Sequence, residues 1–371
     1  MKVMMTGGGT GGHINPAIAI ADNIKDHIPS ADITFVGTSK GMENRLVPRA
    51  GYPLEHIEIQ GLKRSLSLSN IKTAWLTLTS VPRANKLLKK YKPDLVVGTG
   101  GYVSYPLCRA AAALHIPTAV HESNAVPGLA VRMLSPYVDI IFTNFEEAAS
   151  YIKPKYRNKI IRVGNPGKTK GEKMTEKEAK SSLGLDKFRY NVLVYGGSLG
   201  ADTINNAASE YAKKYLPERA DICLCHAAGV ANYEDVKCKY GDAANAANVR
   251  LLDYIYDMPV RQAAADIIIC RSGAMTTSEI ASAGRAAIFV PSPNVTDDQQ
   301  YKNAKALADR DAAVLIRDAD FNADTMNEAI NSLLDDRVKR ETLCRNVREF
   351  AVPDADERIF EQLMKLTGEK R

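Results

Sequence analysis

The sequence lacks the paired cysteines that mark a zinc ribbon or a disulfide framework. Its six cysteines are scattered and none forms a Cys-x-x-Cys pair, so we expect reduced thiols in a cytosolic enzyme. It also lacks an apolar run near the roughly 18 residues that span a bilayer. The apolar run at Val3, Met4 and Met5 is too short for the core of a signal peptide. We therefore expect neither a secreted nor a membrane-spanning protein.

A strong excess of one charge is missing as well. The 371 residues include 49 basic and 43 acidic side chains, a net charge of +6, which is too small to argue for nucleic-acid binding. Apolar residues make up 45% and charged residues 25%, an ordinary globular composition that excludes disorder, collagen and coiled coil as the main organisation. At roughly 100–200 residues per domain, the length predicts two domains.

Short apolar runs alternate with helix-length segments along the chain, which predicts parallel sheets covered by helices on both faces. The order of strand, glycine loop and helix begins twice, near residues 2 and 191. We therefore predict two doubly wound α/β domains facing a central cleft, because ligands bind at the carboxyl ends of the strands in such sheets. The predicted boundaries are 1–163, a linker at 164–190, 191–345, and a C-terminal helix at 346–371 that packs back towards the first domain. The predicted strands are 2–6, 33–37, 95–98, 118–121, 140–143, 161–163, 191–195, 222–226, 249–252, 267–270 and 287–290.

The first glycine loop, residues 7–12, has five glycines in six positions and precedes a predicted helix at 16–27. Such a loop lets backbone amides approach a phosphate, and the helix N-terminus favours an anion there; a tight turn without a ligand is the alternative. His13 stands where a P-loop would carry its lysine, and the strand at 33–37 ends without the acid that a dinucleotide fold uses to hold ribose. A P-loop nucleotide site and a dinucleotide site are therefore both disfavoured.

His13 is the candidate general base. At a helix N-terminus the imidazolium is disfavoured and the neutral ring is favoured near pH 7, and a neutral histidine beside a phosphate cradle can accept a proton. A histidine that only caps the helix or contacts phosphate is the alternative.

The second half repeats the cradle at residues 196–201, with the Ser198 hydroxyl available. Small residues within 271–278 allow close backbone approach. Glu279, expected in the first helical turn, can accept hydrogen bonds from both hydroxyls of a ribose. A helix N-terminal acid that only complements the dipole is the alternative.

Neutral amides and strand-end residues complete the predicted cleft. Gln299 and Gln300 suit sugar hydroxyls without demanding a counter-charge, unless they belong to a solvated loop and helix cap. Residues 99–102 and 121–124 follow strands of the first half, and Lys168 could reach a phosphate. The acid pairs at 318/320 and 354/356 have the spacing of a metal-binding pair, yet they fit turn or capping positions. We therefore expect no metal.

One stretch is wholly without acidic residues. Residues 59–93 contain no Asp or Glu and eight basic side chains, which exceeds the net charge of the whole chain. Apolar residues recur there at helical spacing, and an apolar face flanked by basic side chains suits an anionic membrane surface. A crossover helix packed on the sheet is the alternative, and no base-reading motif supports a nucleic-acid surface. The residues of the predicted membrane face are Leu68, Ile71, Lys72, Trp75, Leu78, Arg83 and Lys86.

Several motifs together carry a family resemblance over about residues 1–310. They are GGTGGH at 8–13, GGYVS at 100–104, HESN at 121–124 with PGLA at 127–130, GNP at 164–166, GGSLGA at 196–201, DM at 257–258, RSGAMTTSE at 271–279 and DQQ at 298–300 with NA at 303–304. The chain resembles the MurG family of peptidoglycan glycosyltransferases.

The resemblance implies a GT-B fold, UDP-N-acetylglucosamine as donor and the lipid-linked muramoyl-pentapeptide diphosphate called lipid I as acceptor. It implies transfer to the muramoyl 4-hydroxyl with inversion, giving lipid II for peptidoglycan synthesis at the inner face of the bacterial membrane. The partners expected are therefore these two substrates and an anionic membrane surface, without nucleic acid and without a metal cofactor.

The resemblance also assigns residues. The catalytic base is His13. Donor contacts are Thr10, Gly11, Gly12, Asn124, Lys168, Ser198, Ile255, Ala274, Met275, Thr276, Thr277, Ser278, Glu279, Gln299 and Gln300, and acceptor contacts are Gly12, Gly100, Gly101, Tyr102, His121 and Glu122.

Two positions depart from the family pattern. Gly167 and Lys168 stand where the family usually has an aliphatic residue and an arginine, and lysine keeps the charge without the planar fork. Tyr105 replaces a usual glycine and is expected to reshape the acceptor loop.

Three other functions stay open on the sequence. They are another sugar-nucleotide enzyme of this fold (a diacylglycerol glycosyltransferase or a UDP-N-acetylglucosamine 2-epimerase), a membrane-docked sugar-nucleotide-binding subunit without chemistry, and, remotely, an NAD-dependent dehydrogenase.

Overall fold

The computed structural model describes residues 1–59, 69–167 and 174–368, with the backbone alone for 69–79. The chain divides into two compact units. Unit 1 comprises Met1–Thr169 and Val352–Arg371, and unit 2 comprises Lys170–Ala351.

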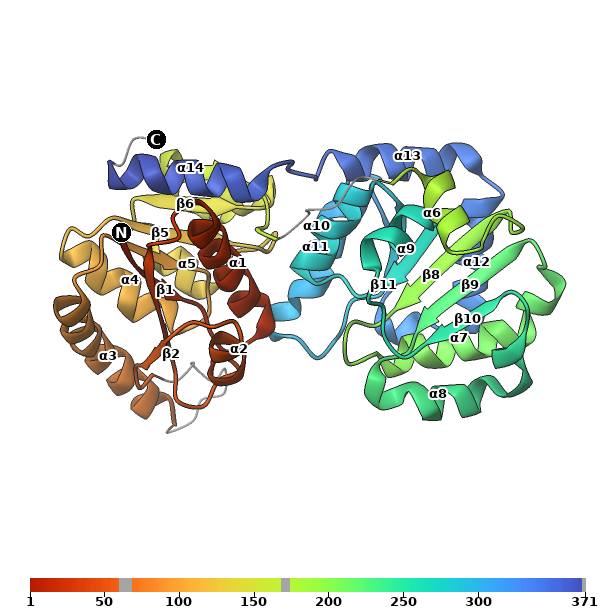
Figure 1. Ribbon diagram of the computed structural model, residues 1–371, viewed down its shortest axis with the longest axis horizontal. Coiled ribbons are helices and arrows are strands. Elements are labelled where there is room, and N and C mark those ends of the chain that lie inside the picture. Colours follow the sequence, from red (N-terminus) through yellow and green to blue (C-terminus); the bar gives the residue numbers. More distant parts are fainter. Residues whose placement is uncertain (60–68, 168–173, 369–371) are drawn as a thin grey trace. The chain divides into compact units, whose positions relative to one another are not determined.

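Unit 1 is built on a parallel sheet of seven strands in the order β3-β2-β1-β4-β5-β6-β7 (Figure 1). The order reverses between β1 and β4, which are hydrogen-bonded neighbours. A doubly wound sheet binds its ligands at such a switch point, outside the carboxyl ends of the strands. The strands are β1 Lys2–Thr6, β2 Asp32–Gly37, β3 Leu54–His56, β4 Leu95–Gly98, β5 Thr118–Glu122, β6 Ile140–Thr143 and β7 Ile160–Arg162.

Helices cover both faces of this sheet. On one face α1 (Gly11–His27) buries Ile14, Ala17, Ile20 and Ile24, a helical repeat of three or four residues, together with α2 (Glu43–Arg49) and α14 (Ala355–Thr367). The other face is covered by α3 (Ser69–Tyr91), α4 (Ser104–Ala113) and α5 (Leu129–Leu134).

Unit 2 repeats the plan with six parallel strands in the order β10-β9-β8-β11-β12-β13, so its switch point lies between β8 and β11 (Figure 1). The strands are β8 Tyr190–Tyr195, β9 Ile222–Ala227, β10 Val249–Leu252, β11 Ile267–Cys270, β12 Ala286–Phe289 and β13 Val314–Leu315. The helices are α6 Glu176–Ser182, α7 Asp202–Lys214, α8 Tyr233–Tyr240, α9 Met258–Ala264, α10 Ala274–Ala283, α11 Gln299–Ala308, α12 Ala323–Leu334 and α13 Arg337–Arg348. The predicted fold class of two doubly wound α/β domains is confirmed.

The structure differs from the sequence prediction at three places. Helix α1 begins at Gly11 instead of residue 16, because the Thr10 carbonyl accepts hydrogen bonds from the amides of His13 and Ile14. The stretch predicted as a linker, 164–190, contains α6, which packs with α9 in unit 2. The short strands β3 and β13 were not predicted.

The single helix predicted at 346–371 is instead the end of α13 followed by α14. Residues 349–354 separate the two helices, and Asp354, in the N-cap position of α14, adopts a positive φ of 59°. Helix α13 packs on α10 and α12 in unit 2, whereas α14 packs on α1 in unit 1. The chain therefore returns to unit 1 between these two helices.

The packing of α14 on unit 1 makes a stability prediction. Leu363 is fully buried in the core that α14 shares with α1, so Leu363→Ala is expected to lower the free energy of unfolding by about 2–5 kcal/mol. Lys365 on the exposed side of α14 is the control, and Lys365→Ala should stay within about 0.5 kcal/mol. Urea titrations of both variants measure the difference, and equal midpoints would contradict the packing.

Candidate functional site

The switch point of unit 1 brings together the loop after β1 and the loop after β4. Gly7 and Gly101 leave room for the two loops to touch, since a Cβ at Gly7 would lie 2.1 Å from the Thr99 side-chain oxygen and a Cβ at Gly101 would lie 2.3 Å from the Gly8 carbonyl oxygen. Any side chain at these positions would force the loops apart. The predicted contacts Gly100, Gly101 and Tyr102 thus lie beside the glycine loop, and the Tyr102 ring is next to Gly9.

The amino end of α1 closes this site. Thr10 is the N-cap residue, so Gly11 and Gly12 begin the first turn, where the first backbone amides have no partner within the helix, whereas the His13 amide donates to the Thr10 carbonyl over 3.1 Å. Amides in that position, together with the helix dipole, favour an anionic ligand. The amino end of α1 can therefore favour an anion, and phosphate binding at the glycine loop stays a prediction.

His13 projects from the first turn of α1 with its ring half-buried. Its Nδ1 atom lies 3.2 Å from the Gly8 carbonyl oxygen and 3.2 Å from Thr10 Oγ1. The carbonyl has no proton to donate, so the first contact is a hydrogen bond only when Nδ1 is protonated. In that tautomer Nε2 carries the lone pair that can accept a proton.

Gly100 keeps the Nε2 edge of the ring open. A Cβ at Gly100 would lie 2.7 Å from Cδ2 and 3.1 Å from Nε2 of His13, and Gly100 has a positive φ of 99°. The Thr99 hydroxyl also holds the His13 backbone in place, because it donates a hydrogen bond to the His13 carbonyl over 2.6 Å.

His121 and Glu122 do not have the placement expected of acceptor contacts. His121 is fully buried, and its Nε2 lies 2.8 Å from the Gly164 carbonyl oxygen. Burial lowers its pKa to about 4 against the opposing effect of that hydrogen bond, so the ring is neutral. The Glu122 carboxylate, 4% exposed, accepts hydrogen bonds from the amides of Asn124 and Gly128. Both side chains support the loop that presents Asn124, because their polar atoms are used inside unit 1.

Tyr105 is the second residue of α4 and packs partly buried against the core that this helix shares with the sheet, so its effect on the acceptor loop stays a prediction. Lys168 lies outside the described residues.

The switch point of unit 2 has a second glycine loop, at residues 196–200. Gly197 and Gly200 adopt positive φ angles of 98° and 75°, and a Cβ at Gly200 would lie 2.0 Å from the Ala228 carbonyl oxygen. Ser198 is exposed at the tip of this loop, immediately before α7. Ser198 is therefore accessible to a ligand, whereas the Gly200 amide donates to the Gly197 carbonyl over 3.0 Å.

Helix α10 begins directly after β11 and carries the predicted nucleotide contacts. Glu279 is its sixth residue, so it lies in the second turn and not in the first as expected from the sequence. The carboxyl is solvent-accessible, yet surrounding protein raises its pKa, an effect that a hydrogen bond with Gln262 opposes. Thr277 is buried and donates its hydroxyl to the Ala274 carbonyl over 2.8 Å, so its side chain stabilises the helix start. Ala274, Met275, Thr276 and Ser278 are half-buried.

Two strained residues precede the glutamines. Asp297 and Asp298 have positive φ angles of 62° and 52°, a conformation that costs about 1–3 kcal/mol per residue and that is typical of functional loops. They place Gln299 and Gln300 at the start of α11. Gln300 accepts a hydrogen bond from the Ser292 amide over 2.9 Å through its side-chain oxygen, and so ties α11 to the loop after β12.

Ile255 lies in the loop after β10 with its side chain buried, which leaves its backbone as the part that a base could contact. The neighbouring Tyr256 is 84% exposed.

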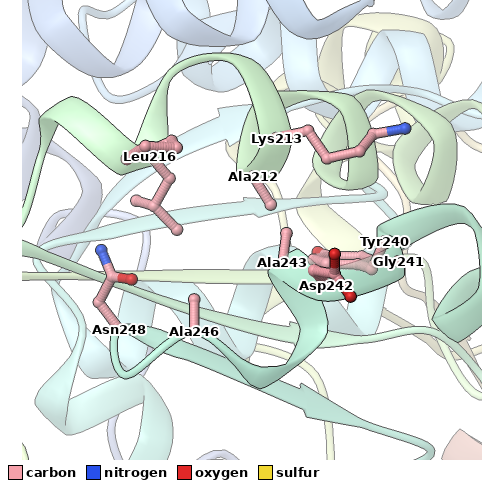
Figure 2. Close-up of a pocket in the computed structure, with 10 residues that line it drawn as sticks. Ala212, Lys213, Leu216, Tyr240, Gly241, Asp242, Ala243, Ala246 and Asn248 are labelled. Atoms are coloured by element: carbon pink, nitrogen blue, oxygen red, sulfur yellow. The ribbon is translucent and has the colours of Figure 1, made fainter.

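A cavity of about 470 Å³ lies elsewhere in unit 2, between the end of α7 and the segment that leads into β10 (Figure 2). Leu216 and Asn248 line one side, and Tyr240 and Asp242 the other. These residues precede the strands, so the cavity opens away from the carboxyl ends where the glycine loops lie. Within the described ranges, no group of three or more His, Cys, Asp and Glu side chains is arranged to hold a metal ion.

Comparison with known proteins agrees with this architecture. Residues 3–143 match the glycosyltransferase family 28 N-terminal domain and residues 191–359 match the family 28 C-terminal domain. The chain is 39% identical over 370 residues to a protein of Acetivibrio thermocellus, covering 100% of this chain and 99% of the relative. It is 40% identical to a protein of Lactiplantibacillus plantarum, covering 98% and 99%. Both relatives are named UDP-N-acetylglucosamine--N-acetylmuramyl-(pentapeptide) pyrophosphoryl-undecaprenol N-acetylglucosamine transferase.

This chain belongs to glycosyltransferase family 28. The resemblance to the MurG family is therefore confirmed. The crystal structure of Acinetobacter baumannii MurG superposes with a TM-score of 0.79 at 30% identity, covering 98% of this chain and 99% of the other. A UDP-GlcNAc 2-epimerase from Neisseria meningitidis shares the fold alone, with a TM-score of 0.64 at 17% identity and coverage of 98% and 100%.

One residue at the candidate site of unit 1 was missed by the sequence analysis. Glu43 in α2 is 1% exposed, and its carboxylate accepts a hydrogen bond from the Gly9 amide over 3.2 Å. The available signal was an acid placed after the glycines at 37 and 41, at the end of the second strand. Because Glu43 is far from the glycine loop in sequence, that signal did not reveal the contact.

The open edge of His13 predicts the effect of a side chain at Gly100. Gly100→Ala combines backbone strain of about 1–3 kcal/mol with a methyl group against the His13 ring, and a displacement of the ring by about 1 Å should cost on the order of 100-fold in transferase turnover. Gly51 also has a positive φ but no atom within 4 Å of its Cβ position. Gly51→Ala therefore introduces the strain without the clash and should keep its turnover. Steady-state rates and urea titrations of both variants test this. Equal rates for Gly100→Ala and Gly51→Ala would contradict the claim that the missing side chain at Gly100 leaves His13 Nε2 open.

Proposed function

We propose that this enzyme transfers N-acetylglucosamine from UDP-N-acetylglucosamine to the muramoyl 4-hydroxyl of lipid I, forming lipid II for peptidoglycan synthesis. The observation that carries the proposal is His13, an imidazole at the amino end of α1 whose Nε2 edge is left open by Gly100. The substrates follow from full-length relatives named for this transfer. The same role links the protein to cell-wall biogenesis, cell shape and cell division.

The chemical step is a direct displacement with inversion. His13 Nε2 takes the proton of the acceptor hydroxyl while its oxygen bonds to the anomeric carbon of the donor sugar. The bond from that carbon to the UDP oxygen breaks, and the electron pair leaves with UDP. Backbone amides at residues 196–200 and the amino ends of α7 and α10 are suited to the charge that develops on the diphosphate.

The donor is proposed to bind mainly to unit 2. Ser198 contacts the diphosphate, and the Ile255 backbone contacts uracil. Glu279 on α10 accepts hydrogen bonds from the ribose hydroxyls. Gln299 and Gln300 hold the N-acetylglucosamine. The further donor contacts proposed from unit 1 and from the connection to unit 2 are Thr10, Gly11, Gly12, Asn124 and Lys168.

The acceptor is proposed to lie along Gly12, Gly100, Gly101 and Tyr102; in support, Gly100 adjoins the His13 ring, and Gly101 and Tyr102 adjoin Gly8 and Gly9. His121 and Glu122 are proposed only to support the loop that presents Asn124. The transfer is proposed to need no metal, since amides, helix ends and Lys168 supply the positive potential.

A peripheral position on the cytoplasmic face of the bacterial membrane completes the proposal. No helix in the described part of the chain is long and apolar enough to cross a membrane. Helix α3 carries the predicted membrane face, and Arg83, Lys86, Lys89 and Lys90 are exposed at its described end. Leu68 lies outside the described residues, and the side chains of Ile71, Lys72, Trp75 and Leu78 are not described.

In the structure, acidic residues from outside 59–93 pair with two basic residues of that stretch. Arg83 pairs with Glu58 over 2.8 Å and Lys90 with Glu55 over 3.2 Å, both at the surface. These pairs reduce the positive charge expected from residues 59–93, so Lys86 and Lys89 are the better probes of membrane attraction.

Removal of the base tests the chemistry. His13→Ala is expected to lower turnover by about 10²–10⁴-fold while UDP-N-acetylglucosamine binding stays intact, because the imidazole acts on the acceptor proton. The assay contains labelled donor, lipid I and EDTA, and the product is a labelled disaccharide lipid.

The control is His115→Asn, because His115 is exposed and asparagine tolerates the positive φ of this position. Full turnover of His13→Ala would remove His13 from the role. An epimerase would change the donor without lipid I, and a binding subunit would bind the donor without making a product.

Charge removal on α3 tests membrane docking. Each basic side chain near an anionic surface contributes about 1 kcal/mol, so Lys86→Gln with Lys89→Gln should weaken binding to phosphatidylglycerol vesicles by roughly 30-fold. The control pair Lys153→Gln with Lys155→Gln removes the same charge from another exposed segment of unit 1. Sedimentation with vesicles measures both, and equal losses would point to net charge instead of a docking face.

A further inference from the structure

Glu43 is a buried carboxylate that reaches the glycine loop from α2. Its Oε1 accepts hydrogen bonds from the Thr38 amide over 2.8 Å and the Thr38 hydroxyl over 2.7 Å. Its Oε2 accepts the Gly9 amide over 3.2 Å. One side chain thus joins the loop after β2 to the loop after β1.

Three glycines make the space that Glu43 fills. A Cβ at Gly41 would lie 2.0 Å from Oε2, one at Gly37 would lie 2.5 Å from Cγ, and one at Gly8 would lie 3.0 Å from Oε1 of Glu43. The carboxylate is therefore enclosed by backbone from two loops, and its orientation is fixed by packing as well as by hydrogen bonds.

The Gly8–Gly9 peptide bond connects Glu43 to His13. The amide of Gly9 and the carbonyl of Gly8 belong to one planar trans peptide, so they point in opposite directions. The amide donates to Glu43, and the carbonyl lies 3.2 Å from His13 Nδ1. Because hydrogen bonds in a chain polarise one another, a negative carboxylate on the amide side makes the carbonyl a stronger acceptor.

We propose that Glu43 is a positioning residue that holds His13 in the Nδ1-protonated tautomer through the Gly8–Gly9 peptide, which keeps Nε2 as the proton acceptor. The competing arrangement is also within reach, since the Thr10 hydroxyl lies 3.2 Å from Nδ1 and would donate to it if Nε2 were protonated. Glu43 decides between the two by favouring the contact with the Gly8 carbonyl. The importance of this choice for catalysis rests on the proposed function.

The charge on Glu43 agrees with this role. Burial raises the pKa of its carboxyl, but the hydrogen bonds from Thr38 and Gly9 outweigh burial and hold the pKa below its usual value. The group therefore stays ionised in neutral solution, where it can polarise the peptide.

The test reads the tautomer directly. The full-length protein is labelled with ¹⁵N-histidine, and long-range ¹H–¹⁵N spectra are recorded at a pH where the ring is neutral; the His13→Gln variant assigns the His13 signals among the six histidines. The wild-type protein should show a protonated Nδ1 and an unprotonated Nε2 at His13.

The key variant is Glu43→Gln, which keeps the size of the side chain and removes its charge. It should shift His13 towards the Nε2-protonated tautomer and lower kcat by about 10- to 100-fold, by analogy with the loss caused by changing a group that orients a metal-bound histidine. The KM for UDP-N-acetylglucosamine should change little. Asp139 is the control, an exposed carboxylate that accepts the Thr118 amide over 2.9 Å at the amino-terminal ends of β5 and β6, the end of the sheet opposite to the glycine loop. Asp139→Asn should leave both the His13 spectrum and kcat unchanged.

Two outcomes would overturn the proposal. One is an Nε2-protonated His13 in the wild-type protein, a measurement that does not depend on how the variant folds. The other is an unchanged His13 spectrum in folded Glu43→Gln. A tautomer shift in Glu43→Gln together with full turnover of His13→Ala would support the link from Glu43 to His13 and refute the proposed base, so the two claims fail separately.

Discussion

The close approach of two backbone loops at the centre of each sheet is the constraint on which the candidate site depends. In unit 1 the loops after β1 and β4 touch because Gly7 and Gly101 have no side chains, and in unit 2 Gly200 packs against the Ala228 carbonyl for the same reason. This contact brings amides, a helix terminus and His13 into a small volume. Parallel strands set the positions of these loops, and glycine sets how near they come.

The two units support their glycine loops with different side chains. Unit 1 uses the charged Glu43. Unit 2 uses a buried neutral network in which His226 lies 2.9 Å from the Tyr240 hydroxyl and 3.0 Å from Asn205 Oδ1, while Asn205 donates to the Ala228 carbonyl over 3.0 Å. Burial lowers the pKa of His226 to about 3, so the ring is uncharged. A repeated backbone plan therefore does not require repeated chemistry behind it.

Sequence patterns predicted the doubly wound plan because short apolar runs and glycine loops are local signals. They missed β3 and β13, which are only three and two residues long, and they placed the start of α1 too late because Gly11 and Gly12 disfavour helix when read locally. His121 was taken for a contact residue from its position at a strand end, yet its neighbours in space bury it. Glu43 contacts Gly9 and Glu58 contacts Arg83, and both of these partners lie far away along the chain. Neither contact could therefore be predicted from local spacing.

The break between α13 and α14 has a consequence for biosynthesis. Helix α14 supplies Ile359, Phe360, Leu363 and Met364 to the core of unit 1, but it is translated after the whole of unit 2. The amino-terminal sheet therefore emerges from the ribosome with an apolar surface that stays uncovered until α14 follows. Unit 2, which is continuous in the chain, can fold during this interval, so the half that is made second can be completed first.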